Sequence, residues 1–212
     1  MRVPIIIALA VIFISFLVGI VAYPHVPESV ASHWDAAGNA NGTMPRFWGI
    51  FLFPAISLVL FIFLFYIPRL DPLQKNILKF QRYYDGLVLM FVLFMTYIFF
   101  LTLYWNVYGA FTMILFLTPG FCVLFYSIGV VTEHAYPNWT LGFRTPWTLS
   151  SPRVWTKTHQ VGGRLFKIAA IASLLGIVWS RFAILFMVIP VLLAALATVI
   201  YSYVEFRKLK KK

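Results

Sequence analysis

The chain has 212 residues, of which 62% are hydrophobic and only 11% are charged, and its mean hydropathy is +0.89. Soluble domains carry about 25% charged residues, so this composition excludes a water-soluble globular protein and predicts one integral membrane domain over residues 1–212. The formal net charge of +11 would suit nucleic-acid binding only if the basic residues formed one water-exposed patch.

Six apolar runs are predicted to cross the membrane as helices, because about 20 residues span the hydrocarbon layer. The runs are Val3–Tyr23, Phe47–Ile67, Leu87–Trp105, Ala110–Val131, Leu165–Ser180 and Phe182–Val204. The last two are separated because Arg181 at the centre of one long helix would cost about 2.5–3.5 kcal/mol on insertion. The expected fold is therefore an all-α polytopic bundle of six transmembrane helices, with a tight hairpin around Ser180–Arg181.

The distribution of Lys and Arg predicts the orientation. With the N-terminus in the cytoplasm, all Lys and Arg residues lie on the inner side except Arg46 and Arg181. Inner loops are enriched in Lys and Arg, so both termini are expected in the cytoplasm. The excess charge then reflects membrane orientation and contact with anionic lipid, and no direct nucleic-acid binding is expected.

The predicted outer loop, residues 24–46, belongs to an N-terminal part over residues 1–86. Its "DAAGNANG" segment is typical of turns, because Gly and Asn accept positive φ. This loop is a candidate ligand-binding surface, a weak cation site built from Asp35, His25 and His33, or a turn anchored by Trp34. Its candidate binding residues are His33, Trp34, Asp35, Gly38 and Gly42.

Two amphipathic helices are predicted at the inner membrane interface. Asp71 and Pro72 are suited to begin a helix, and the apolar side chains of residues 73, 77, 80 and 84 then share one face. Ser151 and Pro152 begin a second helix by the same logic. Gly162–Gly163 is expected to end or bend that helix before the fifth span.

The inner loop over residues 132–164 belongs to a C-terminal part over residues 87–212, and it is rich in Trp, Thr, Arg and His. Arg144 could bind an anionic group. The same residues could instead brace the inner ends of the helices through hydrogen bonds and aromatic contacts at the interface.

This loop resembles the signature of SdpI-type membrane proteins, N-x-x-(I/L)-G-(I/F)-R-T-P-W-T-L followed by W-x-K-T-H. The matching positions are Asn138, Leu141, Gly142, Phe143, Arg144, Thr145, Pro146, Trp147, Thr148 and Leu149, then Trp155, Lys157, Thr158 and His159. The N-terminal half is similar to an uncharacterised domain that often precedes this signature, through Pro27, His33, Gly38 and Gly42. The resemblance covers nearly the whole chain.

The resemblance implies a multi-pass protein of a prokaryotic cytoplasmic membrane that gives immunity to a secreted peptide toxin. It also implies a second partner, a DNA-binding autorepressor that is held at the inner face when toxin is present. No cofactor or metal is expected on this interpretation. The inner signature residues would then either dock the partner or support the fold.

A membrane enzyme is the alternative interpretation. Glu133, His134 and His159 lie on the predicted inner side, and two His with one carboxylate can bind zinc in a metal-dependent hydrolase. Their spacing matches no HExxH-type motif.

Overall fold

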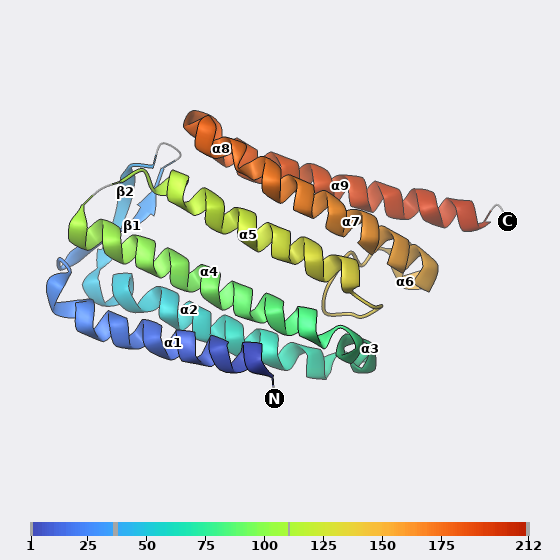
Figure 1. Cartoon of the computed structure of the whole chain (residues 1–212), viewed down its shortest axis with the longest axis horizontal. Helices are drawn as coiled ribbons and strands as arrows, with labels where there is room; N and C mark the ends of the chain where they lie inside the picture. Colours follow the sequence, from blue (N-terminus) through green and yellow to red (C-terminus); the bar gives the residue numbers. More distant parts are fainter. Residues whose placement is uncertain (1, 36–37, 110, 211–212) are drawn as a thin grey trace.

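A computed structural model describes residues 2–35, 38–109 and 111–210, and it is mainly helical (Figure 1). Within these residues, six helices are long and apolar enough to cross a membrane, which confirms the predicted number of spans. They are Val3–His25, Arg46–Leu70, Gln81–Tyr108, Met113–His134, Pro152–Val178 and Ser180–Leu209. Ala110, where the fourth span was predicted to begin, lies outside the described residues.

The secondary-structure elements follow one another along the chain in a simple order. They are α1 (Val3–Ala22), η1 (Tyr23–His25), β1 (Ser29–Trp34), β2 (Ala40–Pro45), α2 (Arg46–Tyr66), η2 (Ile67–Leu70), α3 (Gln74–Lys79), α4 (Gln81–Tyr108), α5 (Met113–His134), α6 (Pro146–Ser150), α7 (Pro152–Ser173), α8 (Leu175–Val178), η3 (Ser180–Phe182) and α9 (Ala183–Lys210).

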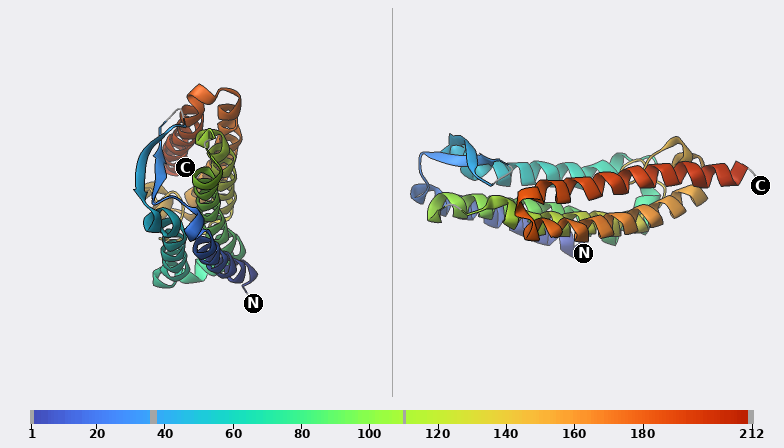
Figure 2. Two further views of the ribbon diagram at one scale, coloured as in Figure 1. Left: turned by 90° about the vertical axis from the view of Figure 1, so that its left-hand side faces the viewer. Right: turned by 90° about the horizontal axis from the view of Figure 1, so that it is seen from above.

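The long helices form two groups of three. Helices α1, α2 and α4 pack together, and α7 packs against both α5 and α9. Contact between α4 and α5 joins the two groups (Figures 1 and 2). Strands β1 and β2 lie at one end of the bundle, which we call the hairpin end, while α3 and α6 lie at the other, which we call the loop end. The sequence predicts that the loop end faces the cytoplasm.

The predicted outer loop forms a β-hairpin, so the prediction of a purely helical fold was incomplete. Strands β1 and β2 pair antiparallel, with Ser29 opposite Pro45 and Trp34 opposite Ala40, and the register shifts around His33. The hairpin is tied to α4 by Asn106, whose Oδ1 accepts from the Ala31 N–H at 2.8 Å and whose Nδ2 donates to the Ala31 carbonyl at 3.0 Å. A side chain from a distant helix thus supports strands that are short and poor in strand-forming residues.

The structure differs from the prediction of two amphipathic helices at the membrane interface. The first is only the short helix α3, because the chain turns at Phe80 before α4 begins. Its apolar residues Ile77, Phe80 and Tyr84 are buried in the protein core, so they pack against protein. The second is the first half of α7, which Ser151 and Pro152 begin as predicted.

Helix α7 continues without a break through Gly162 and Gly163 to Ser173. The Gly pair was predicted to end or bend the helix; the predicted end was wrong, and the bend stays a prediction. A Cβ on Gly162 would lie 2.6 Å from Thr198 Cγ2 of α9, and one on Gly163 would lie 2.4 Å from Glu133 Cγ of α5. Glycine is therefore retained inside this helix because it lets three helices approach closely. The predicted hairpin after the fifth span is present, formed by α8 and η3.

Candidate functional site

The signature loop, which the sequence predicts to be on the inner side, follows α5, and Asn138 organises its first turn. The Asn138 side chain is fully buried. Its Oδ1 accepts from the backbone N–H groups of Thr140 at 2.8 Å and Leu141 at 2.6 Å, and its Nδ2 donates to the Tyr136 carbonyl at 2.7 Å. Asn is favoured in such turns because one side chain satisfies several backbone groups.

Asp71 fastens this loop to the N-terminal group of helices. Its Oδ2 accepts from the Trp139 N–H at 2.8 Å and from the Thr140 hydroxyl at 2.6 Å, while Oδ1 accepts from the Leu73 N–H at 2.7 Å. The predicted helix cap is therefore mainly a clamp between distant segments, and α3 begins three residues later, at Gln74. Sequence reasoning missed this role because the partners of Asp71 lie 68 and 69 residues away.

His159 is the centre of the loop. It is fully buried, and its Nε2 accepts from the Phe143 N–H at 2.9 Å while Nδ1 lies 2.8 Å from the Trp155 carbonyl. Because Nε2 accepts, the proton belongs on Nδ1 and the ring is neutral. The imidazole also stacks on Trp155 with ring centroids 3.9 Å apart. Trp155 in turn donates from Nε1 to the Ala135 carbonyl at 2.7 Å.

Gly142 is required next to His159 for two reasons. Its φ is +111°, which favours glycine. A Cβ at this position would also lie 2.3 Å from His159 Nε2. The Gly and His of the signature are thus direct spatial neighbours.

Thr145, Pro146 and Trp147 begin the short helix α6. Thr145 and Thr148 form a reciprocal capping box, with Pro146 at the first helical position, as the sequence chemistry of helix starts requires. The Trp147 ring packs on Tyr203 of α9 with centroids 5.0 Å apart. Thr158 is fully buried, and its hydroxyl has no partner among the described residues.

Arg144 lies on the surface of the loop. Its side chain is exposed, and Nη1 donates to the Trp139 carbonyl. This contact fits the bracing interpretation, while the exposed guanidinium retains further donors for a partner.

The three residues of the enzyme alternative have separate partners. Glu133 pairs with Lys167 at 2.7 Å, and His134 stacks on Tyr83 with centroids 3.8 Å apart. Both ring nitrogens of His159 are engaged as described. In the described parts of the chain, no group of three or more His, Cys, Asp or Glu side chains is placed to hold a metal ion.

The candidate residues of the predicted outer loop gather on the β-hairpin. His33 is exposed, and its Nδ1 lies 2.5 Å from Asn41 Oδ1. Asp35 shapes the turn, since its Oδ1 accepts from the Asn39 N–H at 2.9 Å. Trp34 packs edge-on against Trp105 of α4, with centroids 5.8 Å apart.

Two glycines support this hairpin. Gly38 lies in the turn with a φ of +85°. Gly42 is the pairing partner of His33, and a Cβ on Gly42 would lie 3.0 Å from His33 Cβ. The hairpin thus presents His33 to the exterior, while Trp34 anchors it.

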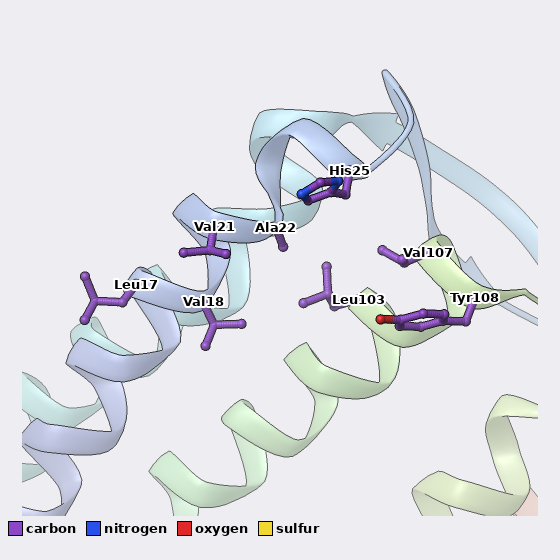
Figure 3. A pocket seen from close by; sticks show the side chains of 8 residues that line it. All are labelled: Leu17, Val18, Val21, Ala22, His25, Leu103, Val107 and Tyr108. Carbon is purple, nitrogen blue, oxygen red and sulfur yellow. The ribbon is translucent and has the colours of Figure 1, made fainter.

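An apolar groove of about 570 Å³ opens beside the hairpin, between α1 and α4 (Figure 3). Helix α1 contributes four apolar side chains, while Leu103 and Val107 come from α4. His25 and Tyr108 bring the polar groups. The sequence analysis did not predict this groove, because its two walls are far apart in the chain and each alone reads as an ordinary apolar span.

Comparison with known proteins finds two family matches. Residues 10–58 match a domain of unknown function, DUF1648, and residues 135–202 match the SdpI/YfhL protein family. The chain is also similar to the protein named Immunity protein SdpI from Bacillus subtilis (strain 168), with 27% identity over 207 residues that cover 96% of each chain. No solved structure matches.

These matches agree with the geometry of the molecule. The second family match contains the whole network around Asn138, Gly142 and His159, and the first contains the hairpin. Six apolar helices and similarity to a bacterial protein over 96% of both chains support a multi-pass protein of a bacterial cell membrane. The chain therefore resembles the SdpI/YfhL protein family over residues 135–202 and is similar to Immunity protein SdpI over nearly its whole length.

Proposed function

We propose that this protein is a membrane immunity protein, which protects a bacterium against a secreted peptide toxin met at the hairpin end. The observation that carries the proposal is the similarity to Immunity protein SdpI, which extends over 96% of both chains. A match of this extent includes both the hairpin and the signature loop, so the relation involves the whole membrane domain.

The hairpin end offers a suitable surface for such a toxin. The exposed His33 can hydrogen-bond an arriving peptide, and the nearby groove between α1 and α4 can take apolar side chains. The hairpin contacts α2 and α4, so a ligand held there would act on the N-terminal group of helices.

The loop end offers a surface for a cytosolic partner, which we propose to be a transcriptional repressor. Arg144 is exposed beside the clamp that joins Asp71 to the loop. A ligand can shift the two helix groups from one arrangement to another only if it binds one arrangement more tightly than the other. The clamp is a connection through which a change in the N-terminal group would reach Arg144.

Replacing His33 with Ala should reduce protection against the cognate toxin. His33 is exposed, so its loss should remove a ligand contact with little effect on the fold. The measurement is survival of a sensitive bacterium that expresses the full chain and is challenged with a panel of secreted peptide toxins. We expect the toxin concentration that halves survival to fall about tenfold, the usual effect of one lost hydrogen bond to a charged group or one packed contact.

His134→Ala is the matched control, because His134 is also exposed but lies at the loop end. It should protect as well as the unaltered chain. Equal protection by His33→Ala and the unaltered chain, at equal amounts of inserted protein, would remove His33 from the proposed site. Failure of the unaltered chain against every toxin would count against the immunity function itself.

Replacing Arg144 with Ala should abolish signalling to the cytosolic partner while leaving membrane insertion intact. The change removes one exposed contact to the Trp139 carbonyl, and surface substitutions usually change stability by about 0.5 kcal/mol or less. The readout is the transcriptional response to toxin. Arg153→Ala, another exposed Arg at the loop end, should retain that response. A loss of inserted protein in Arg144→Ala would show that Arg144 instead supports the fold.

A further inference from the structure

A second cavity lies at the loop end, apart from the hairpin and the signature loop. It has a volume of about 210 Å³ and opens between the start of α1, the end of α2, η2, α3 and the start of α4. Five of its lining side chains carry hydrogen-bond donors: Arg2, Arg69, Gln74, Gln81 and Tyr84. The Tyr84 hydroxyl already donates to the Leu64 carbonyl at 2.7 Å. Its apolar lining residues include Phe65 and Leu78. A partly enclosed space with several donors is suited to an anion.

The charges around this cavity do not balance. The guanidinium carbons of Arg69 and Arg2 lie 4.2 Å and 5.2 Å from the centroid of the same Phe65 ring. Arg2 binds both carboxylate oxygens of Asp85, with Nε 2.8 Å from Oδ2. This hydrogen bond raises the pKa of Arg2, and guanidinium groups in general remain charged in proteins.

Arg69 has no such counterion within the part of the chain that the structure describes. In the described chain, no carboxylate oxygen lies within 4.0 Å of its guanidinium, and its hydrogen bond is a long contact of 3.4 Å to the Phe65 carbonyl. The carboxamides of Gln74 and Gln81 are likewise left without a hydrogen-bond partner among the described residues. Arg2 and Arg69 both lie against the Phe65 ring, and Asp85 neutralises only Arg2. One positive charge therefore remains, and an added anion would stabilise this arrangement.

The surroundings indicate where that anion comes from. Large apolar side chains are strongly exposed beside the cavity: Tyr66 is 55% exposed, Leu70 81% and Leu78 57%. Exposed apolar groups at the ends of membrane-spanning helices face lipid. The cavity therefore opens at the boundary between the hydrocarbon and the headgroups, where the abundant anion is a lipid phosphate.

We propose that this cavity binds the phosphate group of an anionic phospholipid. Arg69 supplies the uncompensated charge, Arg2 a second guanidinium already oriented by Asp85, and Gln74 and Gln81 the neutral donors. Leu78 and Leu70 contact the beginning of the acyl chains. Basic pockets at the cytoplasmic ends of helices are known to recognise lipid headgroups in this way. The site is independent of any immunity function.

The test compares two charge-matched variants of the purified full chain in detergent. Arg69→Gln removes the unpaired guanidinium, and Arg82→Gln removes an exposed positive charge that does not line the cavity. Phosphatidylglycerol, phosphatidylcholine with the same acyl chains, and inorganic phosphate are added separately. Native mass spectrometry counts the retained lipid, and the thermal unfolding midpoint reports stabilisation by each ligand.

We expect phosphatidylglycerol to be retained and to stabilise the unaltered chain more than phosphatidylcholine does. Arg69→Gln should bind it about tenfold more weakly, as a lost charge-assisted hydrogen bond predicts, while Arg82→Gln should bind it as the unaltered chain does. Equal weakening in both variants would reduce the effect to general surface attraction and overturn the proposal. Equal stabilisation by inorganic phosphate would overturn the lipid assignment, because the site would then bind free phosphate.

Arg69 is chosen because no carboxylate depends on it, so its removal should not unfold the protein. The unfolding midpoint without added lipid checks this for both variants. If Arg69→Gln alone unfolds, Gln74→Ala, at an exposed position of α3, takes its place. Unchanged binding of phosphatidylglycerol by that variant would then contradict the proposal.

Discussion

Replacing Gly142 with Ala should destabilise the protein by about 3 kcal/mol. About 1–2 kcal/mol arises from placing an L side chain in a left-handed backbone conformation, since φ at this position is +111°. The added Cβ would also lie 2.3 Å from His159 Nε2, so the imidazole must move away. That movement leaves the Phe143 N–H, which faces the buried His159 ring, without its acceptor, at a cost of about 1–3 kcal/mol.

The measurement is thermal unfolding of the purified chain in detergent. A loss of this size should lower the midpoint by about 6–12 °C for a chain of this length. A double-mutant cycle with His159→Ala isolates the cause, because the shortened side chain at position 159 would no longer meet the new Cβ. The cost of Gly142→Ala should then fall by at least about 1 kcal/mol, as expected for residues in direct contact. Additive effects would show that only the backbone conformation matters.

The membrane-spanning segments were predictable because each one depends on the hydrophobicity of its own consecutive residues. About 20 consecutive apolar residues leave few structures other than a spanning helix, and the structure has six such helices. The predicted hairpin before the sixth span was found for a similar reason, since Arg181 interrupts an otherwise continuous apolar run. The exact ends of the helices were harder to predict, because they depend more on contacts between helices than on hydrophobicity along the chain.

The β-hairpin was missed because its stability comes from residues far away in the sequence. Ala31 is held by Asn106, and Val30 packs so closely on α2 that a Cβ on Gly49 would lie 1.9 Å from Val30 Cγ2. Strand propensity depends strongly on such context. The glycines of the turn were visible in the sequence, whereas the helices that support the strands were not.

The signature loop was identified from its residue pattern, but its internal roles required the fold. The motif included both Gly142 and His159 without indicating that they touch. Asp71 lay outside the motif, and its role as a clamp became visible only when the two halves of the chain were placed together. Buried polar side chains generally need specific partners, and a sequence does not identify those partners.

Gly163 illustrates the same limit, and its replacement with Ala should have the second large effect. The backbone of α7 contacts that of α5 here, since a Cβ on Gly163 would lie 2.5 Å from the Gly129 carbonyl oxygen and 2.4 Å from Glu133 Cγ. The Gly129 carbonyl belongs to the backbone of α5 and cannot rotate away as a side chain can. Helices α5 and α7 must therefore separate. Overpacking of this kind costs about 1–3 kcal/mol, and separation would also disturb the 2.7 Å ion pair between Lys167 and Glu133.

Gly86→Ala is the matched control, because Gly86 also lies within a long helix but a Cβ there would meet nothing within 4 Å. Ala is favoured over Gly inside a helix by about 0.5–1 kcal/mol, so this variant should keep or raise the unfolding midpoint in detergent while Gly163→Ala lowers it. If both substitutions raised the midpoint, the close approach of α5 and α7 would not be what requires glycine at position 163. A midpoint that rises in Gly86→Ala and falls in Gly163→Ala would show that glycine stabilises a helix where another helix packs against it and destabilises a helix where none does.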